Sequence, residues 1–199
     1  MKQHAATAGS GDPTALAFAG AAAMIAHQVA GKAARDGFFL SAYAPSALPA
    51  MVASGAALSL VLAVVFARLF EKFGTRQVTP AAFLLSGALH AIEWMLVDAG
   101  PGVAAVLIYL HIVGLGAILL SGFWLLLSEI FDLRQAKKLF GRIAGAGTAG
   151  GIAGGLIAER VVSLSSTPSL LLMLAILHAA CGILSAGLRG SCVRISKPR

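Results

Sequence analysis

The sequence predicts an all-α polytopic membrane protein with six transmembrane helices. Hydrophobic residues make up 58% of its 199 residues, and charged residues make up only 12%, about half the share in a soluble domain. The mean hydropathy of +0.88 leaves too little polar surface to cover a soluble core. The apolar residues form continuous runs of about twenty residues instead of alternating with polar ones, so we expect membrane-spanning helices and not barrel strands.

Six apolar runs define the expected domain organisation. Each run is bounded by charged residues, Pro or Gly, and each is long enough to cross the hydrocarbon core. The runs cover residues 14–34, 45–67, 78–97, 102–128, 139–158 and 169–188. Residues 1–13 lack the shape of a signal peptide, so we expect a cytoplasmic leader there, and residues 189–199 are expected to form a basic cytoplasmic tail.

The basic residues between the runs predict the orientation. With the N-terminus inside, all of the 15 Lys and Arg residues except Lys32, Arg35 and Arg160 fall on the cytoplasmic side. We therefore expect an integral protein of the bacterial inner (plasma) membrane with both termini in the cytoplasm. The net charge of +7 is then explained by loops that flank membrane lipid, and a nucleic-acid partner is not expected.

Residues 141–155 are rich in glycine and contain the pattern G-x-G-x-x-G at 145–150. A dinucleotide-binding turn needs a strand before this pattern and an acidic residue about twenty positions after it. Here a basic segment of helical character precedes the pattern, and Leu170 occupies the later position. Glycines four residues apart instead favour close packing against another helix. The glycines expected to pack in this way are Gly147, Gly150, Gly151 and Gly154.

Charged residues beside the first run lie where ionisable side chains are costly and often functional. Lys32 and Arg35 end this run on the expected outer side, and a spacing of three residues puts them on one helix face. They either extend to the membrane interface or bind an anionic substrate, with Asp36 limiting their repulsion. The planar guanidinium of Arg35 suits a phosphate group because it offers two parallel hydrogen bonds.

Two acidic residues are further candidates for function. Glu93 lies in the third run, three residues after His90, and we expect it to pair with Arg35 or Lys32 in a structural or gating ion pair. Glu129 ends the fourth run on the inner side. It either belongs to a charged helix end or forms part of an inner gate. The cations expected to balance that helix end are Arg134, Lys137 and Lys138.

The remaining reactive residue types predict neither a metal site nor an enzyme. His27, His111 and His178 fall on three different runs and have no acidic companion at ligand spacing. Cys181 and Cys192 have the spacing of neither a metal site nor a disulfide framework. Because no nucleophile–base pair stands out either, we expect no catalytic residue and no cofactor.

Several segments resemble motifs of one transporter family. Residues 32–41, with Pro49 further on, resemble the first-helix signature of the ATP/ADP translocases, the nucleotide transporters of plastids and obligate intracellular bacteria. Residues 123–140 resemble the segment that ends the family's fourth helix. The matching stretches there are Phe123-Trp124, Ser128-Glu129-Ile130 and Ala136-Lys137-Lys138-Leu139-Phe140. The loop 68–76 is similar to the basic loop between helices two and three of the major facilitator superfamily.

This resemblance implies one six-helix half of a major-facilitator-type bundle. The implied activity is ATP:ADP antiport, or transport of another organic anion, by alternating access with a second six-helix half or a homodimer partner. Position by position, Arg35 falls on a lysine important for substrate, Lys32 falls on the arginine before it, and Glu129 falls on an important glutamate at the end of the fourth helix. The family has about twelve helices and this chain has six predicted ones, so a non-transporting membrane module, as a truncated remnant or an assembly partner, stays open as the alternative.

Overall fold

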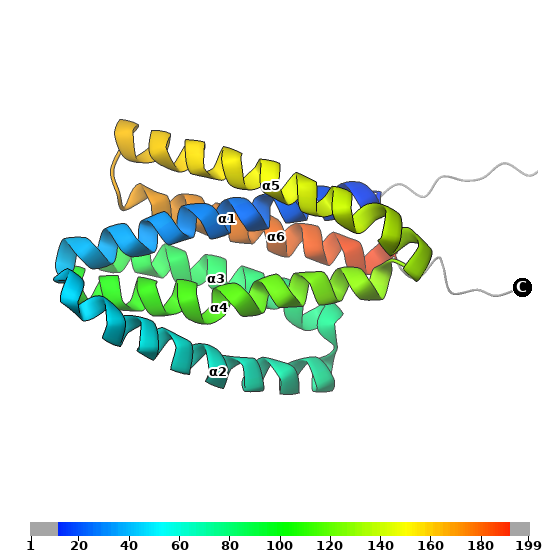
Figure 1. Cartoon of the computed structure of the whole chain (residues 1–199), viewed down its shortest axis with the longest axis horizontal. Helices are drawn as coiled ribbons and strands as arrows, with labels where there is room; N and C mark the ends of the chain where they lie inside the picture. Colours follow the sequence, from blue (N-terminus) through cyan, green and yellow to red (C-terminus); the bar gives the residue numbers. More distant parts are fainter. Residues whose placement is uncertain (1–11, 192–199) are drawn as a thin grey trace, which may run out of the picture.

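The computed structural model describes residues 12–191 as a bundle of long α-helices (Figure 1). The elements are α1 (Pro13–Ala42), the short 3-10 helix η1 (Pro45–Ala47), α2 (Leu48–Phe73), α3 (Thr75–Leu96), α4 (Pro101–Ile130), α5 (Leu133–Leu164) and α6 (Ser169–Ser191). The all-helical prediction is confirmed over these residues, which contain no strand. Most of the expected leader and tail, residues 1–11 and 192–199, lies outside the described part of the chain.

Local sequence signals set the helix ends. Pro13 and Pro101 occupy the first positions of α1 and α4, where the missing N–H leaves no backbone acceptor unsatisfied. Asp132 caps α5: its carboxylate accepts hydrogen bonds from two backbone N–H groups at 2.8 Å, and Gln135 accepts in return from the Asp132 N–H. Gly74, with φ of +78°, makes the sharp turn from α2 into α3.

The helices extend beyond the apolar runs that predict them. α5 covers 133–164 although its apolar run covers 139–158, and α1 continues to Ala42 although its run ends near residue 34. An apolar run measures the part of a helix that suits hydrocarbon. The backbone hydrogen bonds continue through the flanking Lys and Arg residues, which are good helix formers, until a cap or a turn ends the helix.

Four of the described helices are long and apolar enough to cross a membrane, and they identify an integral membrane protein. They are α1, α2 together with η1, α4 and α6. α3 and α5 do not reach this standard because polar and charged residues interrupt them. In α3 the polar residues Thr79, Ser86, His90 and Glu93 are buried inside the bundle, so they reduce the apolar character of the helix without facing its surroundings. Six crossings therefore remain a prediction.

Two of the three buried apolar clusters in the described bundle lie on either side of a polar layer. The first cluster includes Met24, Phe83 and Phe123, and the second includes Ala30 and Ile108. On α1, the buried His27 stands between Met24 and Ala30 in sequence. The polar layer therefore lies where the two clusters meet, in the middle of the bundle.

α5 approaches α1 most closely at its glycines, and the two helices lie side by side in Figure 1. A Cβ atom added to Gly154 would lie 2.6 Å from the Cα of Ala26, and one added to Gly150 would overlap the backbone of Ala22. Gly147 and Gly151 both face the side chain of Ile25. A Cβ atom added to either glycine would lie 3.0 Å from a side-chain carbon of Ile25. The four predicted glycines thus all face α1. The pattern at 145–150 lies inside a helix, not in a turn after a strand.

Candidate functional site

Six polar side chains from four helices meet inside the bundle. We call this group the histidine cluster. Its members are His27 of α1; Ser86, His90 and Glu93 of α3; His111 of α4; and His178 of α6. His90 is 0% and Glu93 is 5% exposed, so the cluster is shielded from the surroundings of the bundle. Buried polar groups at this depth need partners, because each unpaired one destabilises the fold.

Glu93 lies at the centre of the cluster and accepts two short hydrogen bonds. Its Oε2 lies 2.7 Å from Nδ1 of His90, and its Oε1 lies 2.7 Å from Nδ1 of His111. A carboxylate only accepts hydrogen bonds, so both Nδ1 atoms carry the donated proton. Glu93 thereby fixes the ring orientation of two histidines on two helices, and it directs the Nε2 atom of each ring away from itself.

The network continues from these Nε2 atoms in two directions. Nε2 of His90 lies 3.0 Å from Nε2 of His27, and Nε2 of His111 lies 2.7 Å from the hydroxyl of Ser86. The same hydroxyl lies 2.8 Å from Nδ1 of His178. The rings of His27 and His178 stack with their centroids 3.3 Å apart. At the two ends of the network, Nδ1 of His27 and Nε2 of His178 are buried and have no hydrogen-bond partner.

The partners of Glu93 differ from the expected ones. Sequence reasoning paired this carboxylate with Arg35 or Lys32, because all three were expected on the outer half of the membrane. In the structure Arg35 binds Asp36, and Glu93 binds two histidines instead. His90 is one helical turn away on the same helix, and His111 faces it from α4. Both are thus closer partners than a cation near the end of α1.

The structure also brings together histidines that the sequence gives no reason to group, and it gives two of them an acidic partner. Two groups of three side chains bring their ligand atoms within 4.8 Å of one another. One group is His27, His90 and His178, and the other is His90, Glu93 and His111. These residues are far apart in sequence, so spacing along one helix could not reveal the groups. A signal was present in α3, where Ser86, His90 and Glu93 recur at intervals of four and three residues on one helix face.

Lys32 and Arg35, the cationic pair beside the first run, have different surroundings in the structure. Arg35 is half-buried, and its Nε lies 2.8 Å and its Nη2 lies 3.1 Å from the two carboxylate oxygens of Asp36. Its guanidinium also lies 4.9 Å from the ring centroid of Tyr109. Lys32 is exposed. An anion near this end of the bundle would meet one exposed ammonium group and one guanidinium that a carboxylate already holds.

Glu129 forms an ion pair that sequence reasoning did not anticipate. Its Oε2 lies 3.6 Å from Nε of Arg76, and its backbone carbonyl accepts a hydrogen bond of 3.5 Å from the same side chain. The pair joins the start of α3 to the end of α4. The expected cations Arg134, Lys137 and Lys138 follow in α5. The contact thus connects the first three helices to the last three.

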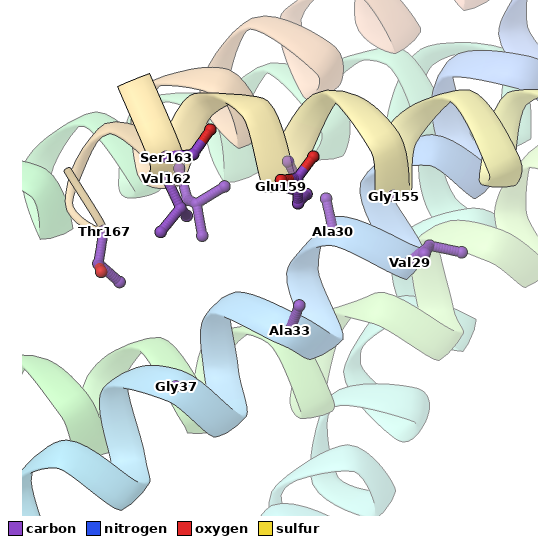
Figure 2. A pocket seen from close by; sticks show the side chains of 11 residues that line it. Val29, Ala30, Ala33, Gly37, Gly155, Glu159, Val162, Ser163 and Thr167 are labelled. Atoms are coloured by element: carbon purple, nitrogen blue, oxygen red, sulfur yellow. The ribbon is translucent and has the colours of Figure 1, made fainter. Parts of the chain in front are cut away.

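A groove opens between α1 and α5 at the end of the bundle where their chains diverge (Figure 2). It encloses about 550 Å³. Val29, Ala33 and Gly37 line it from α1, and Glu159 and Val162 line it from α5. The lining contains no residue of the histidine cluster and neither Lys32 nor Arg35. Its largely apolar wall, with one carboxylate, does not provide the cationic site expected for an anion.

Comparison of the chain with protein-family models, with curated proteins and with solved structures finds no match.

Proposed function

We propose that this chain is one six-helix half of a membrane transporter that works by alternating access. The observation that carries the proposal is the order in which the helices pack. α1 packs against α5, α4 packs against α2, and α3 packs against α6. The first two contacts are equivalent if α1 corresponds to α4 and α2 corresponds to α5. Exchanging α1, α2 and α3 for α4, α5 and α6 leaves this set of contacts unchanged. The set therefore has the symmetry expected of two three-helix repeats.

The direction of the helices supports the same interpretation. α1 and α4 begin at opposite ends of the bundle, so the second set of three helices runs inverted relative to the first (Figure 1). Inverted three-helix repeats inside a six-helix half are the plan of major facilitator transporters, in which one half moves against the other. This plan is also the one that the resemblance to the ATP/ADP translocases implies.

The charge distribution supports a cytoplasmic position for both chain ends. α1 begins and α6 ends at the same end of the bundle (Figure 1). Most of the described basic residues lie near this end, whereas the opposite end carries three. The larger set is Arg68, Lys72, Arg76, Arg134, Lys137, Lys138, Arg142 and Arg189, and the smaller set is Lys32, Arg35 and Arg160. Positive charge concentrates on the cytoplasmic side of membrane proteins.

The proposed substrates are nucleotides such as ATP and ADP, or another organic anion. This choice follows from the resemblance, which places Arg35 on a lysine important for substrate, and from the cationic pair of Lys32 and Arg35, whose repulsion Asp36 limits. A phosphate group would take the place of the Asp36 carboxylate on the guanidinium of Arg35, because both anions fit the same planar pair of donors. The exposed Lys32 would add a second positive charge.

The proposed gate is the ion pair between Arg76 and Glu129. It bridges the two repeats at the proposed cytoplasmic end, so movement of α3 relative to α4 would break it. In this fold the substrate path lies between two six-helix halves. The second half would be another copy of this chain or another six-helix unit.

Uptake by intact bacterial cells that express this chain tests the proposal. Labelled ATP and ADP are supplied outside, and the amount of protein in the membrane is measured in parallel. Arg35→Ala should raise the half-saturation concentration about 10–100-fold, because it removes charged hydrogen bonds to phosphate. Arg160→Ala is the matched control, since Arg160 is an exposed arginine at the same end that pairs with its neighbour Glu159. Equal loss in both variants, or uptake no greater than in cells without the chain, would contradict nucleotide transport by this chain.

A further inference from the structure

We propose that the histidine cluster binds a divalent first-row transition metal ion through His27, His90 and His178, with Glu93 and Ser86 holding the ligands in position. This site is separate from the proposed anion site and does not depend on transport. An absence of nucleotide uptake would leave it unaffected.

The first argument is the spacing of the three imidazoles. Their ligand nitrogens lie within 4.8 Å of one another, although they come from α1, α3 and α6. A tetrahedral ion with nitrogen ligands at about 2.0–2.1 Å needs those nitrogens about 3.4 Å apart. The Nε2 atoms of His27 and His90 are 3.0 Å apart, so binding the same ion needs them to separate by about half an ångström and the rings to turn until both lone pairs point at it.

The second argument is that these histidines have lone pairs to offer. Nδ1 of His90 is engaged by Glu93, and Nδ1 of His178 is engaged by Ser86, so the Nε2 atom of each ring is the one left to bind an ion. Nε2 of His178 and Nδ1 of His27 are buried without any hydrogen-bond partner. Unpartnered buried polar atoms are rare because they cost stability. A bound ion would supply the missing partner of Nε2 of His178.

The alternative group of His90, Glu93 and His111 is less suited to ligation. The ring nitrogens of His111 both have hydrogen-bond partners, Glu93 on one side and Ser86 on the other. Both oxygens of Glu93 are also engaged. An ion held by Glu93 and the two Nδ1 atoms that face it would break both short hydrogen bonds of Glu93, whereas an ion among His27, His90 and His178 breaks one.

Glu93 then acts as the orienting partner of a metal-binding histidine. A carboxylate that accepts from the second ring nitrogen fixes the tautomer and makes the ligand a stronger base. Its negative charge also offsets part of the double charge of the ion, which matters because a buried charge without a counter-charge is costly. Ser86 orients His178 in the same way, through a hydrogen bond of 2.8 Å.

The donor set selects the class of ion. Imidazole nitrogens suit Zn²⁺, Co²⁺, Ni²⁺ and Cu²⁺, whereas Mg²⁺ and Ca²⁺ require oxygen ligands. The buried thiol of Cys181 belongs to neither group of ligand atoms and lies 3.9 Å from the backbone carbonyl of Gly20. The ion would tie α1 to the packed pair of α3 and α6, so loading should raise the unfolding temperature.

Metal binding to the purified full chain tests the proposal. The protein is prepared in detergent with an affinity tag that contains no histidine, stripped with a chelator and titrated with Co²⁺ or Zn²⁺. We expect one ion per chain and the visible absorption of tetrahedral Co²⁺. His27→Gln and His178→Gln should each weaken binding more than about 100-fold, whereas Ser86→Ala, which removes only an orienting partner, should weaken it about 10–100-fold. Cys181→Ala and Thr79→Val, buried changes outside the cluster, should leave binding unchanged.

X-ray absorption of the Zn²⁺-loaded wild-type protein identifies the ligands directly, so this test does not depend on whether a variant folds. The proposal expects three imidazole nitrogens around the ion. A shell of oxygens alone, or one that contains sulfur, would overturn it, as would a wild-type protein that retains no ion. Binding that survives in His27→Gln and His178→Gln but is lost in His111→Gln would also overturn it, because the ion would then belong to the other group.

Discussion

Replacing Gly154 by alanine tests the close packing of α5 on α1. A Cβ atom at this position would lie 2.6 Å from the Cα, 2.7 Å from the Cβ and 2.8 Å from the carbonyl oxygen of Ala26. Non-bonded carbon atoms prefer a separation of about 3.5–4.0 Å. Backbone and Cβ atoms cannot rotate out of the way, so the two helices must move apart by about 1 Å.

The expected loss of stability can be separated from the helix propensity of alanine. Overpacking of this kind costs about 1–3 kcal/mol of unfolding free energy. Alanine also favours the helix over glycine, by about 0.8–1.0 kcal/mol in water, and this gain hides part of the loss. Gly145→Ala is the matched control, because Gly145 lies in the same helix and an added Cβ atom meets nothing within 4 Å. The propensity gain is common to both variants and cancels when they are compared. Gly154→Ala should therefore be about 1–3 kcal/mol less stable than Gly145→Ala.

The assay is unfolding in mixed micelles. Sodium dodecyl sulfate is titrated into protein in a non-ionic detergent, and the loss of structure is followed by circular dichroism and tryptophan fluorescence. A lower midpoint for Gly154→Ala than for Gly145→Ala is the predicted result. Equal midpoints for the two variants would refute the close approach of the helices at this glycine.

Four further predictions use the same titration. Phe123→Ala should lower the unfolding free energy by about 3–5 kcal/mol because the ring is fully buried. Leu133→Ala is the control, since this side chain is 74% exposed, and it should change the unfolding free energy by no more than about 0.5 kcal/mol. Similar effects of the two variants would contradict the described core. Glu93→Gln should lower the unfolding free energy by about 1–3 kcal/mol, because the amide NH₂ group of the glutamine would face an imidazole N–H and neither could accept a hydrogen bond. A variant as stable as the wild type would exclude the two hydrogen bonds of Glu93. Asp132→Ala should cost about 1 kcal/mol through loss of the α5 cap, and no loss would argue against the capping box. Arg76→Ala should cost no more than about 1 kcal/mol, because its ion pair is exposed, and a larger loss would mean that the pair is part of the core.

The sequence predicts the helices well because hydropathy and helix ends are local properties. Every apolar run lies largely within one described helix. The helix starts also have local signals: Pro13 is the first residue of α1, and Asp132 caps the start of α5. The glycines of α5 are a second local signal, because a row four residues apart defines a helix face before its partner is known. The partner itself, α1 at Ala22 and Ala26, could be found only from the three-dimensional packing.

The sequence predicts side-chain partners poorly because these depend on how separate helices rotate and tilt. Glu93 and Arg35 were expected at one level of the membrane, but level alone does not fix which helix faces which. His27, His111 and His178 are far apart in sequence, so their meeting in the histidine cluster could not be predicted from spacing.

The claim on which the proposed transporter half depends is that all six helices cross the membrane. Single cysteines in a cysteine-free background, labelled in intact cells by a membrane-impermeant reagent, test it most directly. Suitable exposed positions are Ala44, Ala99 and Ser166 at one end of the bundle, and Lys72 and Leu133 at the other. The account predicts labelling of Ala44→Cys, Ala99→Cys and Ser166→Cys from outside, and labelling of Lys72→Cys and Leu133→Cys only after the cells are permeabilised. Ala99→Cys or Ser166→Cys that reacts only after permeabilisation would mean that α3 or α5 does not cross, and would contradict the account.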